Sequence, residues 1–193
     1  MNLGCKLNTK KIVKLLRHLK ELAFEKNLKN DFEIVKRERR MLNLDEVNTV
    51  GILYHFSDEE TNKIINEFVS VLKSNHRKVT VIGHFNERTL PQYYIQTLDW
   101  NILTPKKVNW FNKPAASFVK SFCDQEFDLL IDLTMEDFQP IIYTGALSRA
   151  HFKTGRYTER NAKYYDLMIN TEQVQSLPEF IQHFKHYISK VNR

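Results

Sequence analysis

The chain has 193 residues, of which 42% are hydrophobic and 27% charged, and its formal net charge is +6. This length suits one domain with an extension, and the apolar content excludes a disordered chain. No apolar run approaches the roughly 20 residues that span a bilayer, and the first 20 residues lack the apolar core of a signal peptide, so we expect a cytoplasmic protein without a transmembrane segment.

The N-terminal part, residues 1–41, is predicted to be a basic helical arm. Its first 40 residues contain 12 Lys and Arg against 5 Asp and Glu, whereas the other 153 residues carry a net charge of −1. After Thr9, a candidate N-cap, apolar residues recur at three- and four-residue spacing and predict an apolar stripe on a helix. The stripe consists of Ile12, Leu15, Leu16, Leu19, Leu22 and Ala23. A lone helix of this length is only marginally stable, so the stripe should pack on the body of the protein or on a partner.

Residues 42–193 are predicted to form one α/β domain, in which buried strands alternate with helices. The predicted strands are residues 49–54, 78–83, 100–103, 127–133, 151–154 and 165–169. The predicted helices are residues 57–74, where Ser57 and Glu60 form a capping box, then 114–122, 141–150 and 178–190. This alternation predicts a parallel sheet with helices on both faces, a three-layer Rossmann-like fold.

Three segments in the second half of the domain carry a family resemblance. Phe127–Leu133, Ala146–Ala150 and Phe152–Arg156 resemble a family of uncharacterised bacterial proteins found chiefly in Bacteroidota, over about residues 48–171. The same stretch is more remotely similar to the N-terminal half of heptosyltransferase-type GT-B glycosyltransferases. That similarity implies a strand order of 3-2-1-4-5 with room for a sixth strand. It does not imply the activity, because those enzymes bind the nucleotide-sugar mostly through a second Rossmann domain, for which this chain has no residues.

A crevice at the carboxyl ends of the strands is the predicted ligand site. Ligands of doubly wound sheets bind where the strand order reverses, here between the strands at 49–54 and 127–133. The polar residues expected to line it are His55, Ser57, Asp58, His84, Asn86, Asp132 and Thr134. Asp58, Asp132 and His55 are the candidate catalytic residues, and the other four are candidate ligand-binding residues. The alternative is structural: Ser57 caps a helix, Asp132 and Thr134 form hydrogen bonds at a strand end, and the histidines lie on the surface.

Several other chemistries are not supported by the sequence. The helix after the first strand starts Asp58-Glu59-Glu60, which would repel a phosphate at that position, and there is no Gly-rich or Walker-type loop. His183 and His186 lie on adjacent helical turns but have no identifiable third ligand. We therefore predict neither a metal site nor a cofactor.

The two cysteines, Cys5 and Cys123, are too few for a disulfide framework. Cys123 falls in a predicted helix, where a small buried thiol is expected rather than a nucleophile.

Our leading hypothesis is a non-catalytic binding module whose basic arm docks on an RNA-containing or protein partner. The cations assigned to this contact are Lys10, Lys14, Arg17, Lys36, Arg37, Arg39 and Arg40. Aromatic residues for base stacking are scarce in the arm, so contact with nucleic acid would be electrostatic. An anionic membrane is a further alternative, although the centre of the stripe lacks Trp and Phe. The competing hypotheses are a sugar- or nucleotide-binding protein or enzyme that uses the crevice, and a homodimer formed through the stripe.

Overall fold

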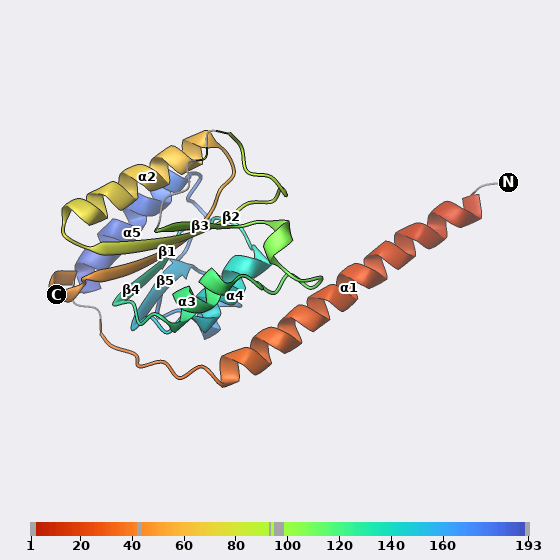
Figure 1. The fold of residues 1–193 in the computed structure, drawn as a ribbon, viewed down its shortest axis with the longest axis horizontal. Helices are drawn as coiled ribbons and strands as arrows, with labels where there is room; N and C mark the ends of the chain where they lie inside the picture. The colour runs from red at the N-terminus through yellow and green to blue at the C-terminus, as the bar shows by residue number, and fades with distance from the viewer. Residues whose placement is uncertain (1–2, 42–43, 93, 95–98, 192–193) are drawn as a thin grey trace.

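The structure, a computed structural model, describes residues 3–41, 44–92, 94 and 99–191, and its centre is a six-stranded parallel sheet (Figure 1). The strands are β1 (Thr49–His55), β2 (Lys78–His84), β3 (Trp100–Leu103), β4 (Leu129–Asp132), β5 (Phe152–Arg156) and β6 (Leu167–Ile169). Their order is β3-β2-β1-β4-β5-β6, and every neighbouring pair is parallel. The predicted strand order is therefore confirmed, including the sixth strand.

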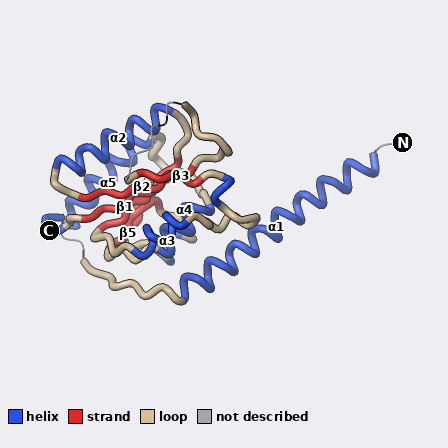
Figure 2. The backbone as a smooth tube through the Cα atoms, viewed as in Figure 1, coloured by secondary structure: helices blue, strands red, loops and turns tan. Residues whose placement is uncertain are grey.

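Helices cover both faces of this sheet, as Figure 2 shows. They are α1 (Leu3–Glu33), α2 (Glu59–Ser74), α3 (Ser117–Asp124), α4 (Gln139–Leu147) and α5 (Leu177–Val191). Short 3-10 helices lie at Leu44–Glu46, Pro105–Lys107 and Asn161–Lys163. Apolar side chains of α2 and α5 form one core with the sheet, and those of α3, α4 and the C-terminal half of α1 form the other. This is the predicted three-layer Rossmann-like arrangement with an N-terminal helix.

The central strands are largely apolar because both of their faces are buried. In β1, Val50, Ile52 and Tyr54 lie in the core with α2 and α5, and Leu53 lies in the opposite core. Gly51 also faces that opposite side, where a Cβ atom would lie only 2.9 Å from the Phe122 ring. The glycine thus lets α3 pack directly against the strand.

Three predicted helix starts are wrong in position. Helix α1 begins at Leu3, so Thr9 is inside it and is not its N-cap. Helix α2 is capped by Asp58, because the Thr61 backbone N–H donates to the Asp58 carboxylate at 2.7 Å; Ser57 lies one residue earlier. Helix α3 begins at Ser117 rather than at residue 114, where the chain still pairs with the residue 108 backbone. None of the helices in the described residues is long and apolar enough to cross a bilayer.

Candidate functional site

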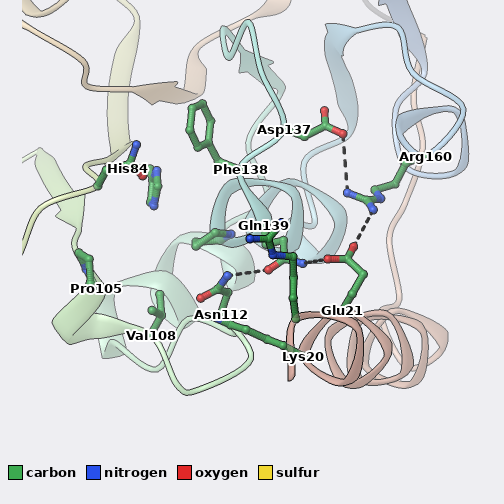
Figure 3. Close-up of a pocket in the computed structure, with 13 residues that line it drawn as sticks. Lys20, Glu21, His84, Pro105, Val108, Asn112, Asp137, Phe138, Gln139 and Arg160 are labelled. Atoms are coloured by element: carbon green, nitrogen blue, oxygen red, sulfur yellow. Dashed lines mark hydrogen bonds and ion pairs between the residues drawn. The ribbon is translucent and has the colours of Figure 1, made fainter. Parts of the chain in front are cut away.

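A cavity of about 540 Å³ lies between α1 and the carboxyl edge of the sheet (Figure 3). The loop after β2, the segment after β3, the start of α4 and helix α1 all contribute to its walls. The lining residues are Arg17, Lys20, Glu21, His84, Asn86, Pro105, Val108, Asn112, Asp137, Phe138, Gln139, Pro140 and Arg160. The cavity lies at the carboxyl edge of the sheet, but its lining does not include the ends of β1 and β4, between which the crevice was predicted. Helix α1, part of the predicted arm, forms one of its walls.

A chain of polar contacts fixes α1 against the rest of this cavity, as the dashed lines in Figure 3 show. Glu21 of α1 accepts from Gln139 Nε2 at 2.6 Å and pairs with Arg160 at 3.0 Å. Gln139 Oε1 in turn accepts from Asn112 Nδ2 at 2.6 Å, and Arg160 also lies 3.7 Å from the Asp137 carboxylate. Both carboxylates of the cavity wall are therefore already matched by partners within the protein.

Two other cations of the cavity wall, Arg17 and Lys20, are unpaired. Neither side chain forms a hydrogen bond or ion pair with any residue that the structure describes. Arg17 is exposed and Lys20 is half-buried. They lie three residues apart on α1, so their side chains emerge on neighbouring positions of one helix surface. The charge that remains available to a ligand in this cavity is positive.

A histidine pair lies at the sheet side of the cavity, with His84 in the lining and His55 in contact with His84. His55 and His84 are register partners at the ends of β1 and β2, and their Nδ1 atoms are 3.3 Å apart. The Phe138 ring stacks on His55 with 3.8 Å between the centroids. Burial, with a smaller effect of the neighbouring His55, lowers the pKa of His84 to about 4, and burial also lowers the pKa of His55. Both imidazoles are therefore neutral at neutral pH, and one Nδ1–H donates to the other Nδ1.

The predicted ligand-binding residues, and with them the candidate base His55, fall into two neighbouring places. His84 and Asn86 line the cavity of about 540 Å³. His55 and Ser57 line a smaller cavity of about 160 Å³, which shares Phe138 with the first. Thr134 is buried and lines neither of them. The structure thus brings four of the predicted residues to the crevice region.

The two predicted catalytic carboxylates are elsewhere. Asp58 is exposed and caps α2. Asp132 is only 2% exposed and accepts hydrogen bonds from the Thr134 hydroxyl at 2.7 Å and the Tyr165 hydroxyl at 2.7 Å. Burial raises the pKa of Asp132 despite these hydrogen bonds. Neither carboxylate faces either of the two crevice cavities, and Asp132 instead ties the end of β4 to the segment before β6.

Helix α1 has two opposite faces. Phe24 and Leu28 are fully buried in the core with α3 and α4, and Phe32 contacts the Tyr164 ring at 4.9 Å between centroids. The large residues of the predicted stripe are instead 47% to 58% exposed. At about 100° per residue, positions nine apart point in opposite directions. Leu15 is nine residues before Phe24, and Leu19 is nine before Leu28.

The same offset holds for the rest of the stripe. Each of the other stripe residues lies nine positions before a residue of the opposite face: Ile12 before Glu21, Leu16 before Glu25, Leu22 before Asp31 and Ala23 before Phe32. All four of these later residues contact the body through ion pairs, hydrogen bonds or ring packing. The stripe therefore points away from the body. The N-terminal part of α1 projects past the α/β domain (Figure 1).

The second basic cluster of the arm is used mostly within the protein. The Arg37 guanidinium is buried, donates to the Ala150 carbonyl at 2.6 Å and the His151 carbonyl at 3.1 Å, and pairs with Asp166. Arg39 lies 3.7 Å from the Asp166 carboxylate. Arg40 pairs with Glu38 at 3.1 Å. Lys36 alone of these four cations is exposed without a described partner.

The first basic cluster lies on the body-facing side of α1. Lys10 and Lys14 precede Leu19 and Ala23 by nine residues, so they emerge opposite the stripe. Both are exposed. With Arg17, they extend the cationic surface that begins at the crevice cavity.

The remaining predicted groups show no reactive arrangement. No group of three metal-binding side chains occurs among the residues that the structure describes, which include His183 and His186. Burial raises the pKa of the Cys123 thiol to about 12, and its Sγ lies 3.5 Å from the Thr144 carbonyl. This cysteine is thus protonated and unreactive, in line with its expected packing role. The side chain of Cys5 lies outside the described residues.

Comparison with curated proteins and with solved structures gave no match. A family model matches residues 20–191 and describes a family of unknown function, DUF6913. The match includes the part of α1 that packs on the body, together with the whole sheet and helices α2, α3, α4 and α5. The chain belongs to this family of unknown function.

Proposed function

We propose that the protein is a non-catalytic binding module that docks through the exposed stripe of α1 into an apolar groove with an acidic rim on another protein. The observation that carries this proposal is the nine-residue offset between the stripe and the residues that anchor α1. Because the anchoring face already holds the helix, the stripe has no role in packing the domain itself. A helix that presents an apolar stripe from a fixed base is a common mode of protein recognition.

The stripe offers enough apolar surface for a specific contact. Full burial of a Leu or Ile side chain contributes about 1.5 to 3 kcal/mol, and the five large stripe residues remain about half-exposed. Covering them would contribute about 5 kcal/mol before the entropic cost of association. An exposed row of this kind on a monomer is unfavourable unless a partner covers it.

The charge around the stripe selects the kind of partner. Residues 10–26 contain six Lys and Arg against two Glu. Lys11 lies four residues before Leu15, and Lys26 lies four residues after Leu22, so a cation borders each end of the stripe. A second copy of the chain would place these cations side by side, whereas an acidic rim would pair with them.

An anionic membrane and RNA fit the geometry of the arm less well than a protein groove does. On an anionic membrane, the stripe would insert while Lys10, Lys14 and Arg17 pointed away from the headgroups. RNA would pair with cations but leave the stripe exposed, and Arg37 is already committed to Asp166. A protein groove is the partner that covers the apolar surface and uses the bordering cations together.

Photo-crosslinking in the cells that produce the protein tests this proposal, because it distinguishes a partner on the stripe from a partner on the opposite face of α1. A benzoylphenylalanine replaces Leu15 or Leu19 on the stripe, and Lys14 on the opposite face in the matched control. We expect one protein adduct from both stripe positions, mapped by mass spectrometry to an apolar groove with acidic residues, and none from position 14. The Lys11→Gln/Lys26→Gln variant should lower the yield of this adduct.

Adducts only to the same chain would establish a homodimer in place of the proposed partner. Adducts to lipid or RNA, or equal adducts from both faces, would likewise overturn the proposal.

A further inference from the structure

We propose that the cavity between α1 and the carboxyl edge of the sheet binds a small phosphorylated molecule, with its phosphate group between Arg17 and Lys20. The cavity of about 540 Å³ has the size of ordinary small-molecule sites, which range over roughly 300 to 1,000 Å³. It lies at the end of β2, beside the reversal of strand order, where doubly wound folds bind ligands.

The electrostatic balance of the lining favours an anion. Its two carboxylates already have cationic partners within the protein: Arg156 pairs with Asp137, and Arg160 is shared among Glu21, Asp137 and Glu25. Arg17 and Lys20 have no such partner among the described residues. A ligand with a dianionic group would pair with both side chains, and these two cations converge from one face of α1.

Uncharged donors complete the site from the opposite wall. His84 is only 8% exposed, and its ring points into the cavity (Figure 3), with Nδ1 held by His55. Its Nε2 has no partner within the described part of the chain. In the tautomer in which His55 Nδ1 donates to His84, this Nε2 carries a proton toward the ligand. The ring as a whole is buried while this nitrogen opens to the cavity, so it offers a hydrogen-bond donor to a polar ligand there.

The start of α4 adds a favourable dipole. Phe138, Gln139 and Pro140 line the cavity, and the first turn of α4 has neither an acidic residue nor a side-chain cap. Pro140 has no N–H, and the Ile141 and Ile142 N–H groups donate to the Phe138 carbonyl, so α4 contributes the positive end of its dipole rather than free donors. The acidic start that opposes phosphate belongs to α2 and lies outside this cavity.

The choice of a phosphorylated small molecule follows from the number and arrangement of the donors. A phosphate has enough oxygens for Arg17, Lys20 and the imidazole together, and the amides of Asn86 and Asn112 remain near the rest of the ligand. The walls come from α1, the β2 and β3 loops and α4, so they surround one molecule rather than follow the repeated phosphates of an RNA strand. This inference is independent of the docking proposal, since the stripe faces away from the cavity.

The test is a titration of the full chain, followed by amide NMR shifts and by calorimetry. The probes are inorganic phosphate, pyrophosphate, adenosine monophosphate and glucose 6-phosphate, with adenosine and glucose as uncharged counterparts. The cavity variant is Arg17→Gln/Lys20→Gln. Its matched control is Lys11→Gln/Lys26→Gln, which removes the same charge from exposed positions of the same helix. None of these four side chains has a described partner, so all variants should fold.

We expect saturable binding of at least one phosphorylated probe, with shifts at Lys20, His84 and Gln139. The cavity variant should weaken that binding by about tenfold or more, and the control variant by less than about twofold. No saturable binding by any probe would overturn the proposal, as would equal weakening by both variants. An oligouridine is titrated as a further probe, and its tighter binding at the same residues would overturn the proposal and assign the site to RNA.

Discussion

Replacing Phe24 by alanine measures whether α1 is held by one face only. The Phe24 ring is fully buried in the core with α3 and α4, and its centroid is 6.2 Å from that of Tyr143. Truncation of a buried Phe costs about 3 to 5 kcal/mol through lost transfer energy and the cavity left behind. Leu15 points the opposite way and is 57% exposed, so Leu15→Ala should cost less than about 1 kcal/mol.

Urea unfolding followed by circular dichroism gives both free energies, and hydrogen exchange shows whether α1 loosens before the body does. In the Phe24→Ala variant we expect faster exchange in the C-terminal half of α1. Similar costs for the two substitutions, or a cost below about 1 kcal/mol for Phe24→Ala, would refute the two-face arrangement.

Three further predictions concern buried charge. Arg37→Met should lower the unfolding free energy by about 3 kcal/mol because it leaves Asp166 poorly paired, whereas Lys36→Met should change it little in the same urea assay. Because the pKa of His84 is lowered to about 4 by burial and by His55, stability should fall as pH drops from about 6.5 to 4, and His84→Gln should flatten this part of a melting-temperature profile. Lys153 is fully buried with its Nζ on the Gly145 and Ala146 carbonyls, and burial lowers its pKa to about 7. The unfolded chain therefore binds more protons between about pH 7 and 10, so stability should rise over that range and rise less in Lys153→Met; an unchanged slope would contradict the assignment.

The sheet could be predicted from the sequence because each central strand is a short apolar run separated by a helix. Buried parallel strands leave that pattern directly, and the crossover rule then restricts their order. A ligand site at the carboxyl edge was expected from the topology of a doubly wound sheet, but the cavity lies beside the end of β2 rather than between β1 and β4. His84 and Asn86 were expected near this edge because His84 ends β2 and Asn86 follows it by two residues.

The walls of the site could not be predicted in the same way, because they depend on distant contacts. Glu21 meets Gln139 across 118 positions, and Arg37 reaches Asp166 across 129. In the sequence, Glu21 and Arg37 look like ordinary surface charges of a basic arm. Asp132 ends a strand, where an exposed carboxylate is plausible, but Tyr165 covers it from another segment.

One signal for the second face of α1 was present in the sequence. Phe24, Leu28 and Phe32 are spaced by four residues, the pattern of a short apolar face. This face begins where the longer stripe ends and points to the opposite side. The leucine-rich stripe dominates a search for helical periodicity, although the shorter aromatic face is the one that packs on the body.

The most direct test of this account is cysteine accessibility on α1, measured in a Cys5→Ser/Cys123→Ala background with a maleimide reagent. In the purified protein, Leu19→Cys should react rapidly and Leu28→Cys slowly, because these positions lie on opposite faces of the helix. In the producing cells, Leu19→Cys should become protected while Lys14→Cys stays reactive. Protection of Leu19→Cys in the purified monomer, or rapid reaction of Leu19→Cys in the cells, would contradict a docking stripe that faces away from the domain.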